Sequence, residues 1–335
     1  MNKTIKRIIL AASIALFASA FAAAKKSIVC VTFPEYDWVR TILGDKAANF
    51  EVTLLQNGGT DLHSWQPSIK DIAKVSICDM LVFVGGESDD WVLKAVREAK
   101  NKKIQAVNMM ECLGDRVKEE EVVEGMQAEE EHEHEHEHEH HDGHDHHHEH
   151  HHDEAEYDEH VWLSLRNAAF LVDVLCQKIC VIDPANAAAY KANAAAYTKQ
   201  LNELDAQYKS AVSSASKKTI LFGDRFPFRY LADDYNLKYY AAFVGCSAES
   251  EASFETIIFL AKKVDELGLN AVLTIEKSDK KIAKTIINNT KNKNQEILEL
   301  DSLQSLTQKE IKAGKSYLGS MKNNLEVLKK ALRSK

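Results

Sequence analysis

Histidine, glutamate and aspartate alternate through one stretch of the chain, and these residue types bind metal ions. Thirteen of the 15 histidines lie in EHEHEHEHEHHDGHDHHHEHHH (131–152), which contains no Lys or Arg. Neutral imidazole and carboxylate are ordinary ligands of divalent transition metals. A run this polar cannot build a packed core, so it predicts a flexible, solvated loop, here 127–156, that binds several ions weakly. Its candidate ligands are His132, His134, His136, His138, His140, His141, His144, His146, His147, His148, His150, His151 and His152.

The composition of this tract separates it from an expression tag, which is terminal and lacks interleaved glutamates. Imidazole-rich segments favour zinc, nickel and copper over manganese, so the tract indicates zinc. Two roles remain open. The tract either raises the local supply of metal or senses its excess, or it is a charged spacer with incidental affinity.

Only two histidines lie outside the tract, so a folded metal site holds at most two of them. His63 lies in QNGGTDLHSWQPS, after an expected strand at 51–55. His160 lies in YDEHVWLS, just after the tract, where a helix begins. A single histidine in a loop is more often structural than a ligand. Here both histidines fall where a cleft is expected, so we predict that both bind metal.

Three carboxylates also directly follow expected strands: Asp224, Glu276 and Asp301. In open α/β sheets, ligands bind beyond the carboxyl ends of the strands. A cleft between two lobes would bring these carboxylates to the two histidines. The alternative is that an acid at this position caps a helix, above all Asp224 and Asp301.

Short apolar runs alternate with amphipathic helical segments twice along the chain, which predicts an α/β fold of two similar lobes with parallel sheets. The expected strands are 27–33, 51–55, 80–84 and 104–108, then 218–222, 238–243, 270–275 and 296–300. The expected helices are 36–43, 68–76 and 89–99, then 228–234, 254–267, 280–288 and 317–332.

A long helix is expected between the lobes, from Pro184 to Val212, with Asp183 as its cap. Its 29 residues would form a rod of about 43 Å, long enough to pack along both lobes and hold them at a nearly fixed angle. The alternative is an ordinary core helix of one domain. An apolar stripe runs along it, formed by Tyr190, Tyr197, Leu201, Leu204 and Tyr208. The expected organisation is an N-terminal lobe at 25–158, connecting helices at 159–213 and a C-terminal lobe at 214–335.

Residues 1–24 have the features of a secretory signal peptide: Lys3, Lys6 and Arg7, then an apolar run, then small residues. No cysteine directly follows the apolar run, so a lipid anchor is not expected and the mature protein should be exported, periplasmic and soluble. The net charge is −9, yet residues 129–156 alone carry 13 acids and no bases. The acidity therefore belongs to the loop, and no basic patch indicates nucleic-acid binding.

Six cysteines are present, Cys30, Cys78, Cys112, Cys176, Cys180 and Cys246, without CxxC or zinc-ribbon spacing. An exported protein can form disulfides, but the apolar surroundings of Cys30 and Cys176 favour buried free thiols. Thiolates bind zinc tightly and oxidise readily, so we do not expect them in a site that must release its metal.

Several segments closely resemble the zinc- and manganese-type (cluster A-I) substrate-binding proteins of bacterial ABC importers. The resemblance runs from about Ser27 to Leu332. It rests on GGTDLHSWQPSIKDI (58–72), DMLVFVGGESDDWV (79–92), the His-rich insertion, DEHVWLSLRNA (158–168) and GKSYLGSMKNNLEVL (314–328). The motifs G-x-D-x-H-x-x-x-P-S and D-x-H-x-W-L place ligands at His63 and His160. The family implies two Rossmann-like lobes joined by a rigid helix, with the metal between them.

One family motif differs in this chain. Zinc members commonly have H-x-A-F-x-Y, whereas this segment is RFPFRY, with Arg225 in place of the histidine. The third ligand is therefore open, and Asp224 is the candidate that could turn inward. Arg225 could instead pair with a nearby carboxylate. The resemblance implies Asp301 as the fourth ligand, with Glu276 in reserve.

The function expected from these features is a monomeric, exported receptor that captures a divalent ion, most simply Zn²⁺, and delivers it to an ABC permease. A manganese or iron receptor of the same family, and a tract-based metal buffer or adhesin-like surface protein, remain the alternatives. An enzyme is not expected. Outside the His-rich tract the chain has no HExxH motif and no histidine beyond the two proposed ligands, and no G-x-S-x-G elbow occurs, so a hydrolase lacks its usual residues.

Overall fold

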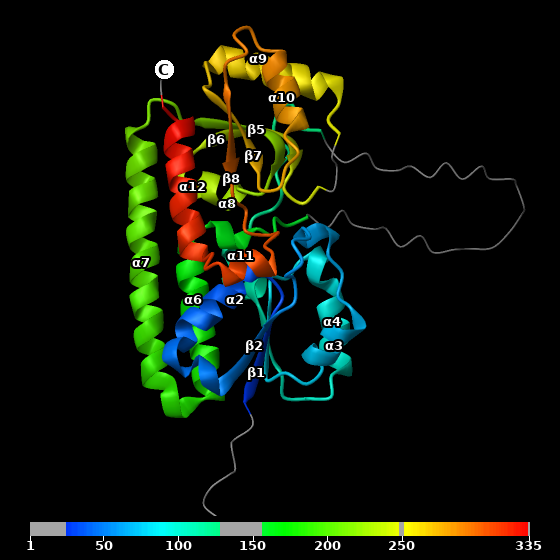
Figure 1. The fold of residues 1–335 in the computed structure, drawn as a ribbon, viewed down its shortest axis with the longest axis vertical. Helices are drawn as coiled ribbons and strands as arrows, with labels where there is room; N and C mark the ends of the chain where they lie inside the picture. The colour runs from blue at the N-terminus through cyan, green and yellow to red at the C-terminus, as the bar shows by residue number, and fades with distance from the viewer. Residues whose placement is uncertain (1–24, 128–155, 248–250, 334–335) are drawn as a thin grey trace, which may run out of the picture.

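The computed structural model describes residues 25–127, 156–247 and 251–333 (Figure 1). The expected signal peptide and the histidine tract lie outside the described residues. Two lobes stand one above the other, each built around a parallel sheet with helices packed on it. This confirms the predicted two-lobe α/β fold.

The N-terminal lobe has a four-stranded parallel sheet in the order β2-β1-β3-β4. Short apolar runs form the inner strands, so that β3 is buried along its whole length. The strands are β1 (Lys26–Cys30), β2 (Phe50–Leu54), β3 (Met80–Phe83) and β4 (Gln105–Asn108). The helices of this lobe are α2 (Phe33–Leu43), α3 (Ile69–Val75), α4 (Asp90–Glu98) and α5 (Met109–Leu113).

The C-terminal lobe repeats this topology, because its parallel sheet has the order β6-β5-β7-β8. The strands are β5 (Thr219–Phe226), β6 (Lys238–Val244), β7 (Ala271–Ile275) and β8 (Glu296–Leu300). The helices are α8 (Arg229–Tyr235), α9 (Phe254–Leu267), α10 (Lys281–Asn288), α11 (Gln308–Lys312) and α12 (Tyr317–Ala331). The carboxyl ends of β5 to β8 carry the loops that face the other lobe (Figure 1).

Strand β5 is longer than its apolar run predicts. It continues to Phe226 through a register irregularity between Phe222 and Arg225, where it pairs with β6. Asp224 therefore lies within the irregular end of a strand rather than in a loop after it.

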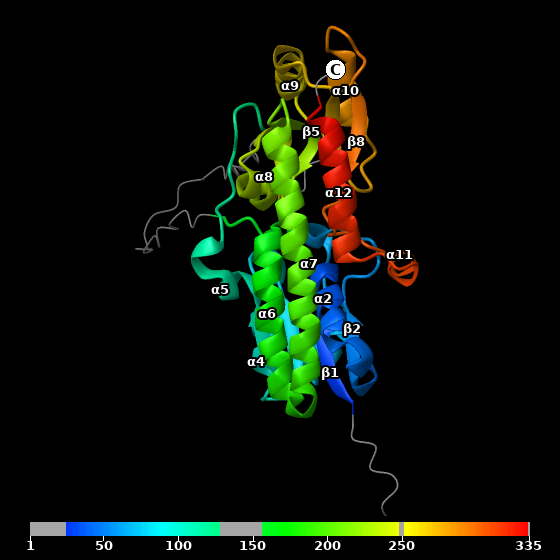
Figure 2. The same ribbon diagram turned by 90° about the vertical axis from the view of Figure 1, so that its left-hand side faces the viewer.

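Two antiparallel helices, α6 (Leu165–Ile182) and α7 (Ala187–Ser214), line one side of the molecule, and α7 extends along both lobes (Figure 2). Hydrogen bonds tie α7 to each lobe. The Asn193 amide donates to the Ile42 carbonyl at 3.0 Å, and the Tyr208 hydroxyl donates to the Met321 carbonyl at 2.6 Å. The predicted apolar stripe of α7 is buried throughout.

The α-helical part of this segment begins at Ala187, three residues later than predicted, because Pro184–Asn186 form a 3₁₀ turn. Asp183 does not cap backbone N–H groups with its side chain. Its carboxylate instead accepts hydrogen bonds from the Tyr190 hydroxyl at 2.6 Å and the Asn186 amide at 2.8 Å.

The largest hydrophobic core is continuous between the lobes. It includes Ile28 of β1, Leu201 of α7 and Phe222 of β5, all of them fully buried. Helix α12 also crosses the boundary, since the Tyr317 N–H donates to the Asp37 carboxylate of α2 at 2.9 Å. A large change in the angle between the lobes would expose this packing, so the fold favours small motions.

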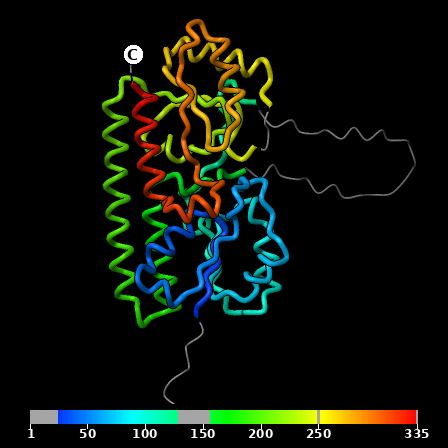
Figure 3. The backbone as a smooth tube through the Cα atoms, viewed as in Figure 1, coloured from blue at the N-terminus to red at the C-terminus, as the bar shows by residue number. Residues whose placement is uncertain are grey.

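Residues 117–127 extend from the N-terminal lobe onto the C-terminal lobe (Figure 3). The Lys118 N–H donates to the Tyr230 hydroxyl at 3.0 Å, and the Gln127 N–H donates to the Ala242 carbonyl of β6 at 2.9 Å.

Among the described residues, no helix combines the length and apolar character needed to cross a membrane.

Leu201→Ala is expected to lower the free energy of unfolding by about 2–5 kcal/mol, because it leaves a cavity in the core shared by both lobes. Gln200→Ala, on the exposed face of the same helix, is the matched control and should change it by less than about 0.5 kcal/mol. Urea unfolding monitored by circular dichroism measures both. Equal losses in the two variants would contradict the proposed packing of α7.

Candidate metal centre

His63 is held by a short 3₁₀ turn, Leu62–Ser64, in the loop after β2. Asp61 caps the turn by accepting the His63 backbone N–H at 3.1 Å, and the side chain of Leu62 is buried beneath it. The imidazole Nδ1 lies 3.1 Å from the Ser88 hydroxyl and 3.7 Å from the Glu159 carboxylate. These contacts leave Nε2 directed into the space between the lobes.

His160 is completely buried and is oriented by Asp158. One carboxylate oxygen of Asp158 lies 2.8 Å from the His160 backbone nitrogen and 2.9 Å from the ring Nδ1. Asp158 is itself fixed, because its carbonyl accepts the Tyr230 hydroxyl at 2.8 Å. A carboxylate only accepts hydrogen bonds, so neutral His160 carries its proton on Nδ1 and has a free lone pair on Nε2.

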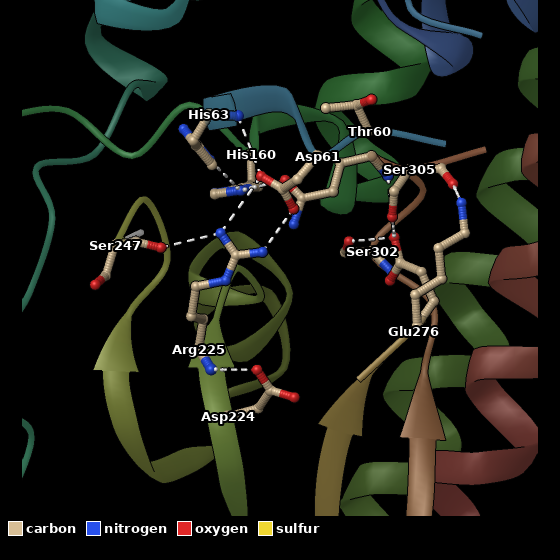
Figure 4. A network of polar contacts seen from close by, with 12 residues as sticks. Thr60, Asp61, His63, His160, Asp224, Arg225, Ser247, Glu276, Ser302 and Ser305 are labelled. Carbon is tan, nitrogen blue, oxygen red and sulfur yellow. Dashed lines mark hydrogen bonds and ion pairs between the residues drawn. The ribbon is translucent and has the colours of Figure 1, made fainter. Parts of the chain in front are cut away.

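The two imidazoles face each other through their Nε2 atoms, 3.2 Å apart (Figure 4). Zinc binds imidazole nitrogen at about 2.0–2.1 Å with tetrahedral angles, which places two such nitrogens about 3.3 Å apart. The observed separation therefore already matches one edge of a tetrahedral zinc site.

Burial and neighbouring charges shift the two histidines in opposite directions. Burial, with the nearby His160, lowers the pKa of His63 to about 3. Burial also disfavours the charged form of His160, but the carboxylates led by Asp158 outweigh it and raise the pKa above its ordinary 6.5. At neutral pH, His63 is thus ready to bind a cation, whereas His160 holds its ring proton more firmly.

A third donor, Cys246, lies beside the two histidines. One atom from each of His63, His160 and Cys246 fits within 4.8 Å of the others, and no other such group of His, Cys, Asp and Glu occurs among the described residues. Burial, followed by the negative charges of Asp158 and Glu120, raises the pKa of the Cys246 thiol well above its usual value. Sequence reasoning missed this residue, although its place just after β6 follows the rule that selected the carboxylates.

The structure does not bring the three predicted carboxylates to the histidine pair. Asp301 forms an ion pair with Lys315 at 2.9 Å. Glu276 accepts hydrogen bonds from the Ser302 N–H at 2.7 Å and from the hydroxyls of Ser302 and Ser305 at 2.8 and 3.1 Å (Figure 4). Asp224 accepts the backbone N–H of the next residue at 2.9 Å. Burial raises the pKa values of Asp224 and Glu276.

Gln304 is a further polar group at the site that the sequence did not single out. Its side-chain oxygen lies 3.3 Å from the Nε2 of His160, and the residue is buried. It follows β8 in the C-terminal lobe, so the two lobes meet at His160.

All six cysteines are free thiols, as the sequence favoured. Cys30, Cys78 and Cys176 are buried, whereas Cys112, Cys180 and Cys246 are partly exposed. Of the three partly exposed cysteines, Cys246 is the one that lies close to His63 and His160.

Arg225 of β5 links the C-terminal lobe to Asp61 of the N-terminal lobe, close to the two histidines. Its guanidinium pairs with the Asp61 carboxylate at 2.5 Å and donates to the Ser247 carbonyl at 3.0 Å (Figure 4). Burial alone would raise the pKa of Asp61, but the hydrogen bond and charge of Arg225 hold it below its ordinary value. The predicted alternative, pairing of Arg225 with a carboxylate, is confirmed.

Two cavities border this region. One of about 750 Å³ is lined by His63, Glu120, Glu159 and Cys246, among others. Another of about 320 Å³ is lined by Asp61, Asp224, Arg225 and Glu276, among others. The larger cavity gives small ions a route to His63 through acidic walls.

A family model and several known proteins match most of this chain. The family model for ZnuA, described as the periplasmic component A of the zinc-uptake complex, matches residues 28–331. The zinc-binding protein AdcA of Streptococcus pyogenes serotype M6 is 30% identical over 91% of this chain and 56% of its own length. The chain thus spans little more than half of that relative.

Two further relatives are covered over most of their length. The high-affinity zinc uptake system protein ZnuA of Bacillus subtilis (strain 168) is 30% identical over 92% of this chain and 88% of its own. The crystal structure of the Zn(II)-bound ZnuA-like domain of Streptococcus pneumoniae AdcA superposes with a TM-score of 0.68 and 26% identity. That match covers 92% of this chain and all of the other.

Arg225→Met is expected to lower the free energy of unfolding of the metal-free protein by about 1–3 kcal/mol, because it leaves the mostly buried Asp61 carboxylate without its partner. Arg97→Met, at an exposed arginine that forms no ion pair with the other described residues, is the control and should have little effect. Urea titration compares the two. No difference between them would show that the interlobe pair does not stabilise the fold.

Proposed function

The chain belongs to the ZnuA family of zinc-uptake proteins, and on this premise we propose that it is an exported receptor that captures Zn²⁺ and hands it to an ABC permease. The ion is bound and released without being chemically converted. The protein acts by presenting deprotonated donors at a fixed spacing and by shielding the bound ion from water.

The observation that best supports this proposal is the 3.2 Å approach of the two Nε2 atoms in a buried position. Each ring is held at its other nitrogen, His63 by Ser88 and His160 by Asp158. Such outer contacts orient metal-binding imidazoles and fix their tautomers. We therefore assign His63 and His160 as the two nitrogen ligands.

The remaining ligands are less constrained by the geometry. Asp224 and Glu276 border the smaller cavity and would have to leave their present hydrogen-bond donors to reach the ion. Asp301 would have to leave Lys315. The donors nearest to the proposed ion are thus nitrogen and sulfur rather than carboxylate oxygen, which favours zinc over manganese or iron.

The segments outside the described residues fit an exported receptor. We propose that residues 1–24 direct export and are removed, and that the histidine tract collects ions near the larger cavity. Residues flanking the tract line that cavity, since both Glu120 and Glu156 contribute to its wall.

We further propose that lobes 25–158 and 214–335 are held by the helices of 159–213, and that the protein acts as a monomer.

His63→Ala or His160→Ala is expected to weaken the tight zinc site by at least about tenfold, or about 1.4 kcal/mol. Isothermal titration with a chelating competitor measures the change, in a background lacking residues 129–155 so that the tract does not contribute. Thr60→Ala, an exposed position in the same loop as His63, is the control and should bind as the parent does. Unchanged affinity in both histidine variants would exclude this site.

Zinc affinity is expected to fall as pH is lowered through the raised pKa of His160, by about tenfold per pH unit from this histidine alone. The sign follows because a proton on Nε2 of His160 competes with the metal. His63, with a pKa of about 3, should add nothing above pH 4. Competition titrations between pH 8 and 5 test this; affinity that stays level to pH 5 would contradict ligation by His160.

A further inference from the structure

We propose that Cys246 is the third zinc ligand of this site and the residue that makes it prefer zinc to manganese. This inference rests on the proposed function and deepens it. From the sequence, this cysteine was not selected as a ligand. The inference is carried by the meeting of Cys246 with His63 and His160 within 4.8 Å.

The backbone on both sides of Cys246 is fixed, so the thiol is placed rather than loosely tethered. The Cys246 N–H donates to the Glu120 carboxylate at 2.9 Å, and Glu120 belongs to the segment that crosses from the N-terminal lobe. On the other side, the carbonyl of Ser247 accepts the Arg225 guanidinium at 3.0 Å.

Gly245 allows this loop to approach His160 closely. A Cβ added at Gly245 would lie 3.2 Å from Cε1 of the His160 ring and 2.9 Å from the Phe226 carbonyl. Any larger residue would push the loop away from the imidazole. The glycine thus brings the next residue, Cys246, against the histidine pair.

Arg225 stands where zinc members of the family commonly have a histidine, so that nitrogen donor is absent from this site. Cys246 can supply a metal donor in its place. A guanidinium stays protonated and has no lone pair for a metal, and here it is occupied by Asp61 and the Ser247 carbonyl. Arg225 and Cys246 thus have complementary roles. The arginine ties the loop to Asp61 of the N-terminal lobe, and the thiol lies within 4.8 Å of a nitrogen of each imidazole. The thiol also contacts the Glu120 carboxylate, which it would leave on binding zinc.

The thiol also differs in its surroundings from the other cysteines. Cys30, Cys78 and Cys176 are buried among apolar side chains of the cores, whereas Cys246 lines the larger cavity together with His63. An ion that enters through this cavity therefore meets nitrogen and sulfur donors at once.

A thiolate with two imidazoles makes a set that suits zinc, since Zn–S bonds form at about 2.3 Å, whereas manganese prefers oxygen ligands. When the Zn–S bond forms, the S–H bond breaks and its proton leaves to solvent through the cavity. The metal is not oxidised or reduced. Structural zinc sites are often closed by several sulfur ligands. A single thiolate with two neutral imidazoles binds zinc without such a closed set.

Cobalt reports sulfur ligation directly, because a Co²⁺–thiolate bond absorbs in the near ultraviolet, whereas nitrogen and oxygen ligands do not give this band. The full-length protein, loaded with one equivalent of Co²⁺, is expected to show it. Cys246→Ser should lose the band and reduce the ratio of zinc to manganese affinity by at least about tenfold. Cys180→Ser is the matched control and should keep both. Cys180 lies in the last turn of α6, about 22 Å along the helix from Leu165.

X-ray absorption at the zinc edge identifies the atoms bound to zinc in the unmodified protein. Its result therefore does not depend on whether a variant folds. A sulfur neighbour at about 2.3 Å is expected there. Tight zinc binding that requires His63 but shows neither the cobalt band nor a sulfur neighbour would overturn the role of Cys246 and leave the receptor intact. Absence of any tight zinc site in the unmodified protein would overturn both.

Discussion

The approach of two buried imidazoles is the interaction on which the rest of this structure depends. Their Nε2 atoms lie 3.2 Å apart. Ser88 and Asp158 hold the Nδ1 atoms of the two rings, so that the neutral rings direct their Nε2 atoms toward each other. The resulting lone pairs converge at the spacing of a tetrahedral ion.

The supporting structure is stiff in the places where this spacing is set. Helix α7 runs along both lobes, and one apolar core joins them. Across the cleft, Arg225 ties Asp61 to the loop that carries Cys246, and Asp61 also caps the turn of His63. One ion pair therefore connects the N-terminal ligand loop to the C-terminal sheet. Metal capture and release then require local rearrangement of these loops more than rotation of whole lobes.

Much of the fold could be predicted because its signals are local. Apolar runs predict the strands, and helix α9 has the bounds expected from its periodicity. The bulged end of β5 could not be predicted, since its pairing depends on β6 and not on the polar residues Asp224 and Arg225 themselves. His63 was selected because it follows a strand, His160 because it follows the His-rich tract where a helix begins, and both because they are the two histidines outside the tract. Cys246 carries no periodic signal, and the direction of Asp301 toward Lys315 depends on how the turn between α11 and α12 folds back onto the end of β8.

Parallel isothermal titration with Zn²⁺ and Mn²⁺ of metal-free protein lacking residues 129–155 would show whether the cleft holds the ion. One tight zinc site per chain and much weaker manganese binding are expected, because the proposed ligands in the cleft are nitrogen and sulfur donors. Manganese binding as tight as zinc would contradict that donor set. Loss of tight zinc binding with the tract would contradict the cleft as the place where the ion is held.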